Sequence, residues 1–288
     1  MVKIIFFGSS EYSVIILNQL LQIPDFKVQA VFTKPDKAVG RQQIITANPV
    51  SAFAKANHLP LFQPEEFDSN LQSTISNLHP DLGLVVAYGP PYFTQDMIDI
   101  PPYKIVNIHP SPLPQYRGAT PGPWQIINGE TTSAVTFFQI DAFPDHGPII
   151  TQIPFDISPD ATATDFYHQA FTLAAQNLET TIKSYLKHPK SLTPQDHAQK
   201  SYFPKFTKDT AKIDWSWDPV KLERFVRALN PWPVAWTEVI NRQNKIIKMK
   251  LFSATVSQNQ LIPQLVQIEG KKPVSWSEIS SHYIIKTA

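Results

Sequence analysis

The sequence predicts an α/β fold in which a Rossmann-like, doubly wound, mostly parallel sheet precedes a small, mostly β domain. Three observations predict this fold. Short apolar runs alternate with amphipathic segments before residue 109. The run 82–87 is apolar throughout, as is typical of a strand buried on both faces of a parallel sheet. Beyond residue 204, segments with strand-like alternation dominate. A chain of 288 residues is long enough for two such domains.

The first domain is predicted to open with a strand over 3–7, a Gly8-Ser9-Ser10 turn and a helix over 11–22. Only one glycine of a G-x-G-x-x-G pattern follows that strand, so nothing here indicates a dinucleotide site. A long polar loop is expected over 34–47. The other elements expected before residue 109 are strands at 28–33, 59–62, 82–87 and 105–108 and helices at 48–56 and 65–78.

Further along, Gly129 is predicted to end a short helix over 123–128, and Thr162-x-x-Asp165 resembles a capping box that begins a long helix over 163–187. The segment 188–204 is mostly polar, contains three prolines and lacks periodicity, which indicates a linker. The remaining predicted elements are strands at 133–140, 149–155, 235–240, 245–252 and 261–269, and a helix from Asp218-Pro219 to Asn230-Pro231. We therefore expect a domain at 1–188, a linker at 189–204 and a second domain at 205–288.

Charge is distributed unevenly between the two predicted domains. Residues 1–202 carry 12 Lys and Arg against 17 Asp and Glu, a net charge of −5, whereas residues 203–288 carry 13 against 7, a net charge of +6. A basic domain of this kind is either a solvated surface or a surface that meets a polyanion.

Composition bounds the class of protein. The chain is 42% hydrophobic and 17% charged, with no apolar run near the ~18 residues of a membrane helix. It has no cysteine, which excludes disulfides and thiolate metal sites. The apolar start over 1–7 is too short for a signal peptide. We expect a cytoplasmic protein without membrane contact.

The stretch from Val106 to Pro121 holds the strongest functional signal. Asn107 and His109 leave a predicted strand on the same face, because side chains alternate along a strand. The proline-rich segment after them cannot continue a sheet, so both residues lie at the carboxyl end of the strand, where open α/β sheets bind ligands. An Asn-x-His pair alone is weak evidence, because a structural histidine is the more common explanation.

The wider pattern is more specific. Asn107-x-His109-x-Ser111-x-Leu113-Pro114, then Arg117-Gly118 and the later Asp145-His146-Gly147-Pro148, resembles the signature of formyltransferases that use 10-formyltetrahydrofolate. Lys212-Ile213-Asp214-Trp215 and Leu229-Asn230-Pro231-Trp232-Pro233 are similar to the branch of that family that formylates methionyl initiator tRNA. The resemblance covers nearly the whole chain.

The resemblance implies that Asn107, His109 and Asp145 are catalytic. Formyl transfer to an amine passes through a tetrahedral intermediate, which needs donors for the oxyanion and a group that manages the proton. Asparagine and histidine can supply the donors, and a nearby carboxylate favours the charged imidazole. Asp141 competes with Asp145 for this role, although an aspartate that begins a loop is usually a turn cap. We favour Asp145 because it lies in the Asp-x-Gly-Pro match.

The resemblance also implies a folate site and a tRNA site. Segment 85–89 resembles the segment that flanks the pteridine. The residues expected to bind folate are Ser111, Pro112, Leu113, Pro114, Tyr88 and Gly89. Pro112 replaces a leucine of the family pattern, which removes an amide donor. Arg41 is expected to bind the acceptor end of tRNA, although Gln42-Gln43 stand where the family usually has lysines.

The second domain resembles the OB-like domain of that branch. The chain between Phe252 and Leu261 is shorter than in the family pattern, so a hairpin is expected to be missing and the barrel truncated. The expected partners are initiator methionyl-tRNA and folate, with a monomeric protein. No metal site is predicted, because the eight histidines show no ligand spacing.

Two other functions remain open. A sugar-nucleotide N-formyltransferase would share the catalytic trio but would need neither the basic domain nor the Asn-Pro-Trp-Pro segment. A non-catalytic folate- or RNA-binding protein on the same scaffold would not need competent residue types at all three catalytic positions.

Overall fold

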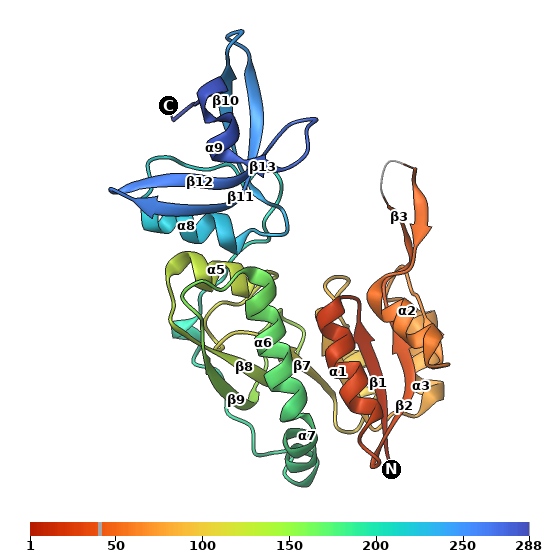
Figure 1. The fold of residues 1–288 in the computed structure, drawn as a ribbon. Coiled ribbons are helices and arrows are strands. Elements are labelled where there is room, and N and C mark those ends of the chain that lie inside the picture. The colour runs from red at the N-terminus through yellow and green to blue at the C-terminus, as the bar shows by residue number, and fades with distance from the viewer. Residues whose placement is uncertain (40–41, 288) are drawn as a thin grey trace. The chain divides into compact units, whose positions relative to one another are not determined.

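The computed structural model describes residues 1–39 and 42–287. It separates into two compact units (Figure 1). The first comprises Met1–Gly118, Ala134–Phe155 and His168–Tyr202, and the second comprises Ala119–Ser133, Asp156–Tyr167 and the chain from Phe203 onward. Within residues 1–39 and 42–287, no helix combines the length and apolar character that crossing a membrane requires.

The first unit is built on a seven-stranded sheet of order β5-β2-β1-β6-β7-β8-β9. Its strands are β1 (Val2–Gly8), β2 (Phe26–Phe32), β5 (Leu61–Phe62), β6 (Leu82–Val86), β7 (Ile105–His109), β8 (Thr132–Gln139) and β9 (Ile149–Asp156). The pairs from β5 to β7 are parallel, and β8 joins β7 in antiparallel register. The chain moves outward from β1 and then returns to β6 on its other side, which confirms the predicted doubly wound topology.

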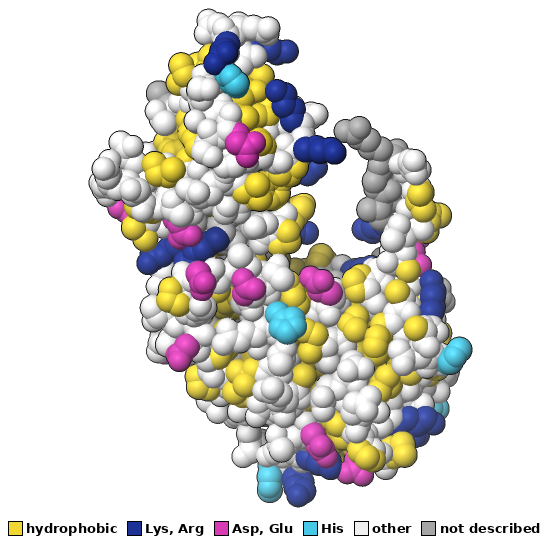
Figure 2. Space-filling model, in the orientation of Figure 1, with side chains coloured by type: hydrophobic (Ala, Val, Ile, Leu, Met, Phe, Trp, Pro, Cys, Tyr) yellow, Lys and Arg dark blue, Asp and Glu magenta, His cyan; other side chains and the backbone are white. Residues whose placement is uncertain are grey.

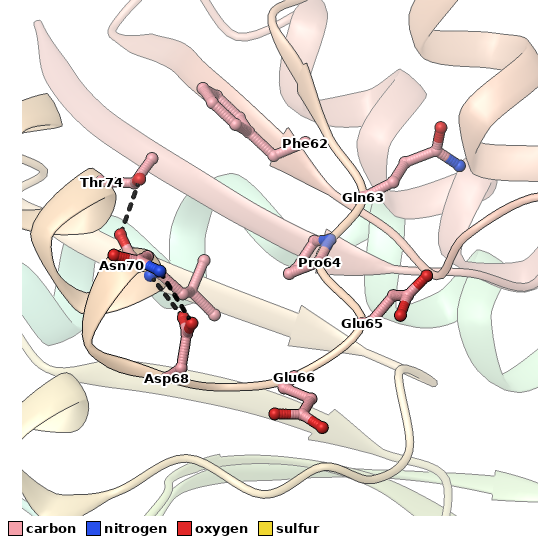
Figure 3. A pocket seen from close by; sticks show the side chains of 9 residues that line it. Phe62, Gln63, Pro64, Glu65, Glu66, Asp68, Asn70 and Thr74 are labelled. Carbon is pink, nitrogen blue, oxygen red and sulfur yellow. Dashed lines mark hydrogen bonds between the residues drawn. The ribbon is translucent and has the colours of Figure 1, made fainter.

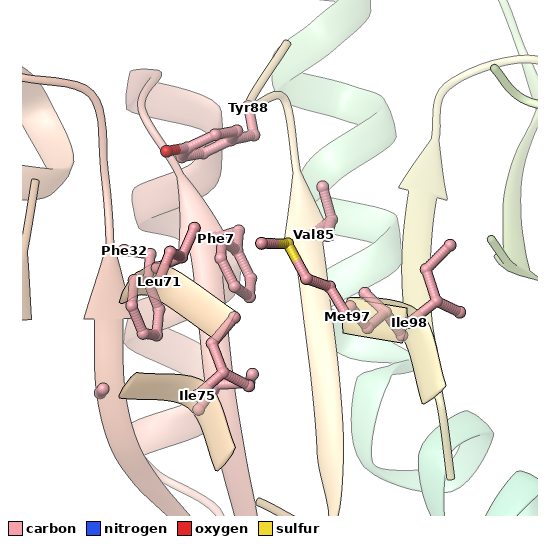
Figure 4. Close-up of a cluster of buried hydrophobic side chains, with 11 residues drawn as sticks. Phe7, Phe32, Leu71, Ile75, Val85, Tyr88, Met97 and Ile98 are labelled. Atoms are coloured by element: carbon pink, nitrogen blue, oxygen red, sulfur yellow. The ribbon is translucent and has the colours of Figure 1, made fainter. Parts of the chain in front are cut away.

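Helices pack against both faces of this sheet. They are α1 (Glu11–Leu21), α2 (Pro49–Ala56), α3 (Ser69–Leu78), α4 (Gln95–Asp99) and α7 (Leu178–Lys187). A further helix, α6 (Ala163–Gln176), begins in the second unit and continues in the first. Alternate residues of β1 point to opposite faces, so Phe7 lies in the cluster formed with α3 and α4 (Figure 4). Phe7 stacks on Phe32 with ring centroids 4.7 Å apart. The core fixes the strand register, and thereby the strand ends that carry the predicted site.

Three predicted elements of this unit differ from the structure. The predicted loop over 34–47 contains a two-stranded ribbon of β3 (Lys37–Val39) and β4 (Ile44–Thr46). The predicted helix over 65–78 begins only at Ser69, because the Asp68 carboxylate caps it by accepting from Leu71 N at 2.9 Å. The predicted helix over 163–187 is broken at Asn177, whose side chain donates to the Leu173 carbonyl and so competes with the helical backbone.

The second unit contains an open five-stranded antiparallel sheet of order β13-β12-β11-β10-β14. Its elements are α5 (Pro121–Asn128), α8 (Pro219–Ala228), β10 (Ala235–Asn241), β11 (Ile246–Ser257), β12 (Gln260–Ile268), β13 (Val274–Ser275), α9 (Trp276–Ile279) and β14 (Tyr283–Ile285). β11 and β12 are joined through Gln258 and Asn259, which both have positive φ, as a tight hairpin requires. The predicted truncated, mostly β domain is confirmed, whereas β13, α9 and β14 were not predicted.

Candidate active site

Asn107 and His109 lie at the carboxyl end of β7, as predicted. Asn107 pairs with Val85 of β6 and Phe138 of β8, and His109 pairs with Thr136. Because every second side chain of a strand points to the same face, Asn107 and His109 leave the same face of β7. β7 therefore presents an amide and an imidazole side by side in the first unit.

His109 is held in a defined orientation. The residue is only 6% exposed, and its Nε2 lies 3.0 Å from the carbonyl oxygen of Tyr116. A carbonyl oxygen only accepts, so Nε2 carries a proton. Nδ1 lies 3.7 Å from Oδ1 of Asp145, which is too long for a hydrogen bond but close enough for strong attraction if the ring becomes charged. Nδ1 forms no hydrogen bond with Asp145 at this distance, so Nδ1 is the ring nitrogen that can exchange a proton with a substrate.

Asp145, and not Asp141, faces the histidine. Oδ2 of Asp145 accepts from Gly118 N at 2.8 Å, which leaves Oδ1 toward His109. Asp141 accepts from Phe143 N at 2.9 Å and lies 2.6 Å from Nδ1 of His146, so it caps its own loop. The choice of Asp145 over Asp141 agrees with this geometry.

Asn107 completes the group. Its side chain is half-buried, and none of the residues that the structure describes forms a hydrogen bond with it. A polar side chain at a strand end that has no partner in the fold is available to a ligand. Its amide N–H group can donate to an oxygen that develops negative charge.

The loop after β7 contains the residues predicted to bind folate. The Ser111 hydroxyl donates to the carbonyl of Gln115 at 2.8 Å, so it shapes the loop rather than facing outward. Leu113 is buried, and its carbonyl accepts from Gln152 at 2.7 Å. Pro112 and Pro114 are half-buried. The loop is rigidly tied to its surroundings, and a ligand would meet mainly its backbone and prolines.

Tyr88 and Gly89 follow β6, the parallel neighbour of β7. The Tyr88 side chain lies in the core cluster (Figure 4), where burial raises its pKa to about 12. Among the described residues its hydroxyl has no hydrogen-bond partner, and Nζ of Lys34 lies 4.1 Å from its ring centroid. Gly89 is exposed and has a φ of +70°, and a Cβ atom built on it would meet only open space. Of this pair, Gly89 is the residue that a ligand could approach.

One predicted residue cannot be placed, and one cavity lies apart from this group. Arg41, predicted to bind tRNA, lies outside the described residues. A cavity of about 480 Å³ lies beside β5 and the start of α3 (Figure 3). Its lining includes Glu65, Glu66 and Asp68, but none of the proposed catalytic residues. Asp68 is already used as a helix cap, and among the described residues the other acidic side chains are not paired with a donor of the catalytic group. We therefore do not place the catalytic site in this cavity.

The sequence did not indicate a second set of polar contacts beside the catalytic group. Arg117 is only 5% exposed, and its Nη2 contacts Oε1 of Gln195 at 2.6 Å and Nδ1 of His197 at 2.8 Å. Burial lowers the pKa of Arg117, while the carboxylates of Asp145 and Asp141 act in the opposite direction. A buried arginine requires acceptors, so Arg117 in the signature was the signal that could have pointed to these residues.

Comparison with known proteins identifies the family of this chain. Residues 2–182 match the formyl transferase family, and residues 205–267 match the formyl transferase C-terminal domain. A methionyl-tRNA formyltransferase from Alkaliphilus oremlandii is 36% identical over 260 residues, which cover 90% of this chain and 82% of that protein.

Two solved structures share the fold. The methionyl-tRNA formyltransferase from Clostridium thermocellum aligns with a TM-score of 0.60 at 14% identity, over 93% of this chain and 99% of that one. The N-formyltransferase from Helicobacter canadensis, in complex with folinic acid and dTDP-3-aminofucose, aligns with a TM-score of 0.65 at 21% identity, over 96% and 99%. At identities of 14% and 21%, the two structures show the fold alone. The family is shown by the match over residues 2–182 and by the relative that is 36% identical. The chain belongs to the formyl transferase family.

Proposed function

We propose that this protein transfers the formyl group of 10-formyltetrahydrofolate to the amino group of methionyl initiator tRNA. The observation that carries the proposal is the pairing of His109 with Asp145 beside the unpartnered amide of Asn107, as judged among the described residues. This arrangement occurs in a chain of which 90% aligns with a methionyl-tRNA formyltransferase.

The geometry suggests how the proton is managed. Because Nε2 of His109 is committed to Tyr116, Nδ1 takes the proton that the attacking amine loses. Asp145 at 3.7 Å stabilises the imidazolium that results. The amide of Asn107 donates to the oxyanion of the tetrahedral intermediate. When the bond from the formyl carbon to the folate nitrogen breaks, Nδ1 returns the proton to that nitrogen.

The co-substrate site is assigned to the same edge of the sheet. The folate would lie against the backbone of the loop 111–114 and beside Tyr88 and Gly89, where the open space at Gly89 admits a ligand. The residues present therefore fit a flat, partly apolar donor molecule. Arg41 is assigned to the acceptor end of the tRNA on the basis of the resemblance.

The basic C-terminal part is assigned to the body of the tRNA. Lys248 lies with Nζ 3.7 Å from the ring centroid of Trp236, and Lys212 lies 5.4 Å from the same ring. On the face shown in Figure 2, Lys and Arg side chains gather over the C-terminal sheet. Lysines interleaved with aromatic rings are typical of surfaces that contact nucleic acid. We retain 1–188 as the catalytic domain, 189–204 as a linker and 205–288 as the tRNA-binding domain.

A protein with this substrate would act as a monomer in the cytoplasm, where charged initiator tRNA is used. The test is a formylation assay that offers methionyl initiator tRNA or an amino-sugar nucleotide to the wild-type protein, with His109→Ala as the blank. We expect formylation of the tRNA alone. Formylation of the sugar nucleotide alone would replace the proposal with the sugar reaction, and formylation of neither would indicate a binding protein.

In the same assay, Arg41→Ala should lower the formylation of methionyl-tRNA more than it lowers overall tRNA affinity. This outcome is expected because Arg41 is assigned to the reacting end and not to the body of the tRNA. Equal losses of turnover and affinity would remove that assignment.

A further inference from the structure

The side chain of Gln195 joins the loop after β7, which orients His109, to the loop that carries Asp145. Its Nε2 donates to the carbonyl oxygens of Asp145 at 3.1 Å and Gly147 at 2.7 Å. Its Oε1 accepts from Nη2 of Arg117 at 2.6 Å. Gln195 is only 6% exposed, so these bonds form away from solvent.

The position of Arg117 makes this bridge consequential. Tyr116, on one side of it, offers the carbonyl that holds Nε2 of His109, and Gly118, on the other, donates its N–H to Asp145. Anchoring the arginine side chain to Gln195 therefore fixes both neighbouring peptide groups. Through one amide, the loop that orients the imidazole is tied to the loop that carries the carboxylate.

The chemical type of residue 195 suits this task. A glutamine offers a donor and an acceptor on one planar group, and here both ends are used. It is neutral, so it adds no charge that would compete with Asp145 for His109. A glutamate at this position would keep the contact with Arg117 but would turn a carboxylate toward two carbonyl oxygens.

We propose that Gln195 is a positioning residue for the reaction, which sets the separation of His109 and Asp145 through Arg117 and the backbone of the 141–147 loop. This inference rests on the proposed function for its kinetic consequence. It assigns a role in the active site to the segment 189–204, which the sequence indicated only as a linker.

The first test compares Gln195→Met with Gln195→Glu. Methionine retains the length of the side chain and removes every hydrogen bond, whereas glutamate removes only the donors. Both variants should lower kcat by about 10- to 100-fold, because small displacements of reacting groups are costly. KM for each substrate should stay within about twofold, because Gln195 is buried and is assigned to neither substrate site.

A matched control separates positioning from stability. Gln125 is a fully buried glutamine whose Nε2 donates to the carbonyl of Pro121 at 3.2 Å and whose Oε1 accepts from Ser133 at 2.6 Å. Gln125→Met should lower the melting temperature while leaving kcat per folded molecule unchanged. If Gln125→Met and Gln195→Met lower kcat equally, the role of Gln195 is structural and the proposal is wrong.

A double-variant cycle tests the path of action. If Gln195 acts through Asp145, adding Gln195→Met to Asp145→Asn should lower kcat by less than about twofold further. Losses that multiply in full would show that Gln195 acts independently of the carboxylate, and would overturn the proposal.

A readout without substrate distinguishes this inference from the proposed function. The ¹H–¹⁵N ring signals of His109 should shift in Gln195→Met and remain unchanged in Gln125→Met. If the wild type forms no formyl product but these signals shift, the reaction is wrong while the positioning role stands. If the wild type is active and neither kcat nor the His109 signals change in Gln195→Met, the positioning role is wrong.

Discussion

The imidazole ring of His146 stacks on that of His197, with centroids 4.0 Å apart and 6° between the planes. A guanidinium only donates, so Nδ1 of His197, 2.8 Å from Arg117, is an acceptor and the ring is neutral. Desolvation, followed by the positive charges of His146, Arg117 and Lys200, lowers the pKa of His197 below its ordinary value of 6.5, and Asp141 opposes them.

We therefore expect His197 to make folding stability depend on pH. Above pH 6.5 the ring is neutral in both the folded and unfolded chains, and its contribution to stability is fully present. As the pH falls from 6.5 to the lowered folded pKa, the unfolded chain binds a proton that the folded chain does not, so the free energy of unfolding decreases. Urea unfolding between about pH 8 and about pH 5 should show a shallower pH dependence for His197→Gln than for the wild type. Identical slopes would contradict this expectation.

Asn107→Ala should lower transition-state stabilisation by about 2 to 4 kcal/mol, the effect of losing one oxyanion donor. His109→Ala should lower the rate by about 100-fold or more, because the group that takes and returns the proton is lost. Single-turnover formylation rates provide the measurement. Folding should be intact, as judged by the melting temperature. His168→Ala, a change on the surface of α6, is the control and should retain wild-type turnover. Wild-type rates in either of the first two variants would remove that residue from the catalytic group.

Asp145→Asn should remove the negative charge of the side chain while keeping its size and its hydrogen bond to the backbone. The amide oxygen can still accept from Gly118 N, but the negative charge beside Nδ1 of His109 is lost. We expect kcat to fall by about 100-fold, because the negative charge that attracts the imidazolium formed during the reaction is lost. Asp141→Asn should cost far less, since Asp141 bonds within its own loop. A larger loss at Asp141 would reverse the assignment.

Gly147→Ala should disrupt the site by a steric route. A Cβ atom at this position would lie 1.9 Å from the carbonyl oxygen of Gln139, so the 141–147 loop must move. The expected loss is about 1 to 3 kcal/mol of folding stability, together with reduced turnover. Gly270→Ala provides a comparison, because φ there is +79° but open space surrounds the atom. It should cost about 1 kcal/mol and leave turnover intact.

Salt should weaken tRNA binding steeply if the C-terminal lysines contact phosphates. Replacing Lys245, Lys248 and Lys250 with glutamate should reduce the slope of log affinity against log salt by about one for each phosphate that is no longer neutralised. The control replaces Lys27, Lys187 and Lys190, three exposed lysines of the first unit. If both triple variants show the same salt dependence, the C-terminal surface does not bind the tRNA.

Local pattern predicted most of the first unit. Apolar runs and caps placed β1, β6 and β7 to within two residues, because strands buried on both faces have few alternatives. The wrong boundaries have local causes. A side chain that bonds to its own backbone, as at Asn177, is difficult to distinguish in a sequence from an ordinary helical asparagine.

The candidate site was predictable only in part. Strand alternation placed Asn107 beside His109, whereas the approach of Asp145 followed from the family resemblance. A buried Arg117 requires acceptors, but the sequence did not identify Gln195 as one of them, because Gln195 lies in a polar segment without periodicity, 78 residues from Arg117. Tertiary interactions of this kind depend on the folded path of the chain and leave no local signature.

The open sheet of the second unit ends in two very short strands. β13 consists of Val274 and Ser275, and β14 of Tyr283 to Ile285. Long unpaired edges of sheets recruit other chains, and short edges flanked by lysines resist this. Lys271 and Lys272 precede β13, and Lys286 follows β14. The open sheet therefore offers another chain little backbone to pair with, although it does not close into a full barrel.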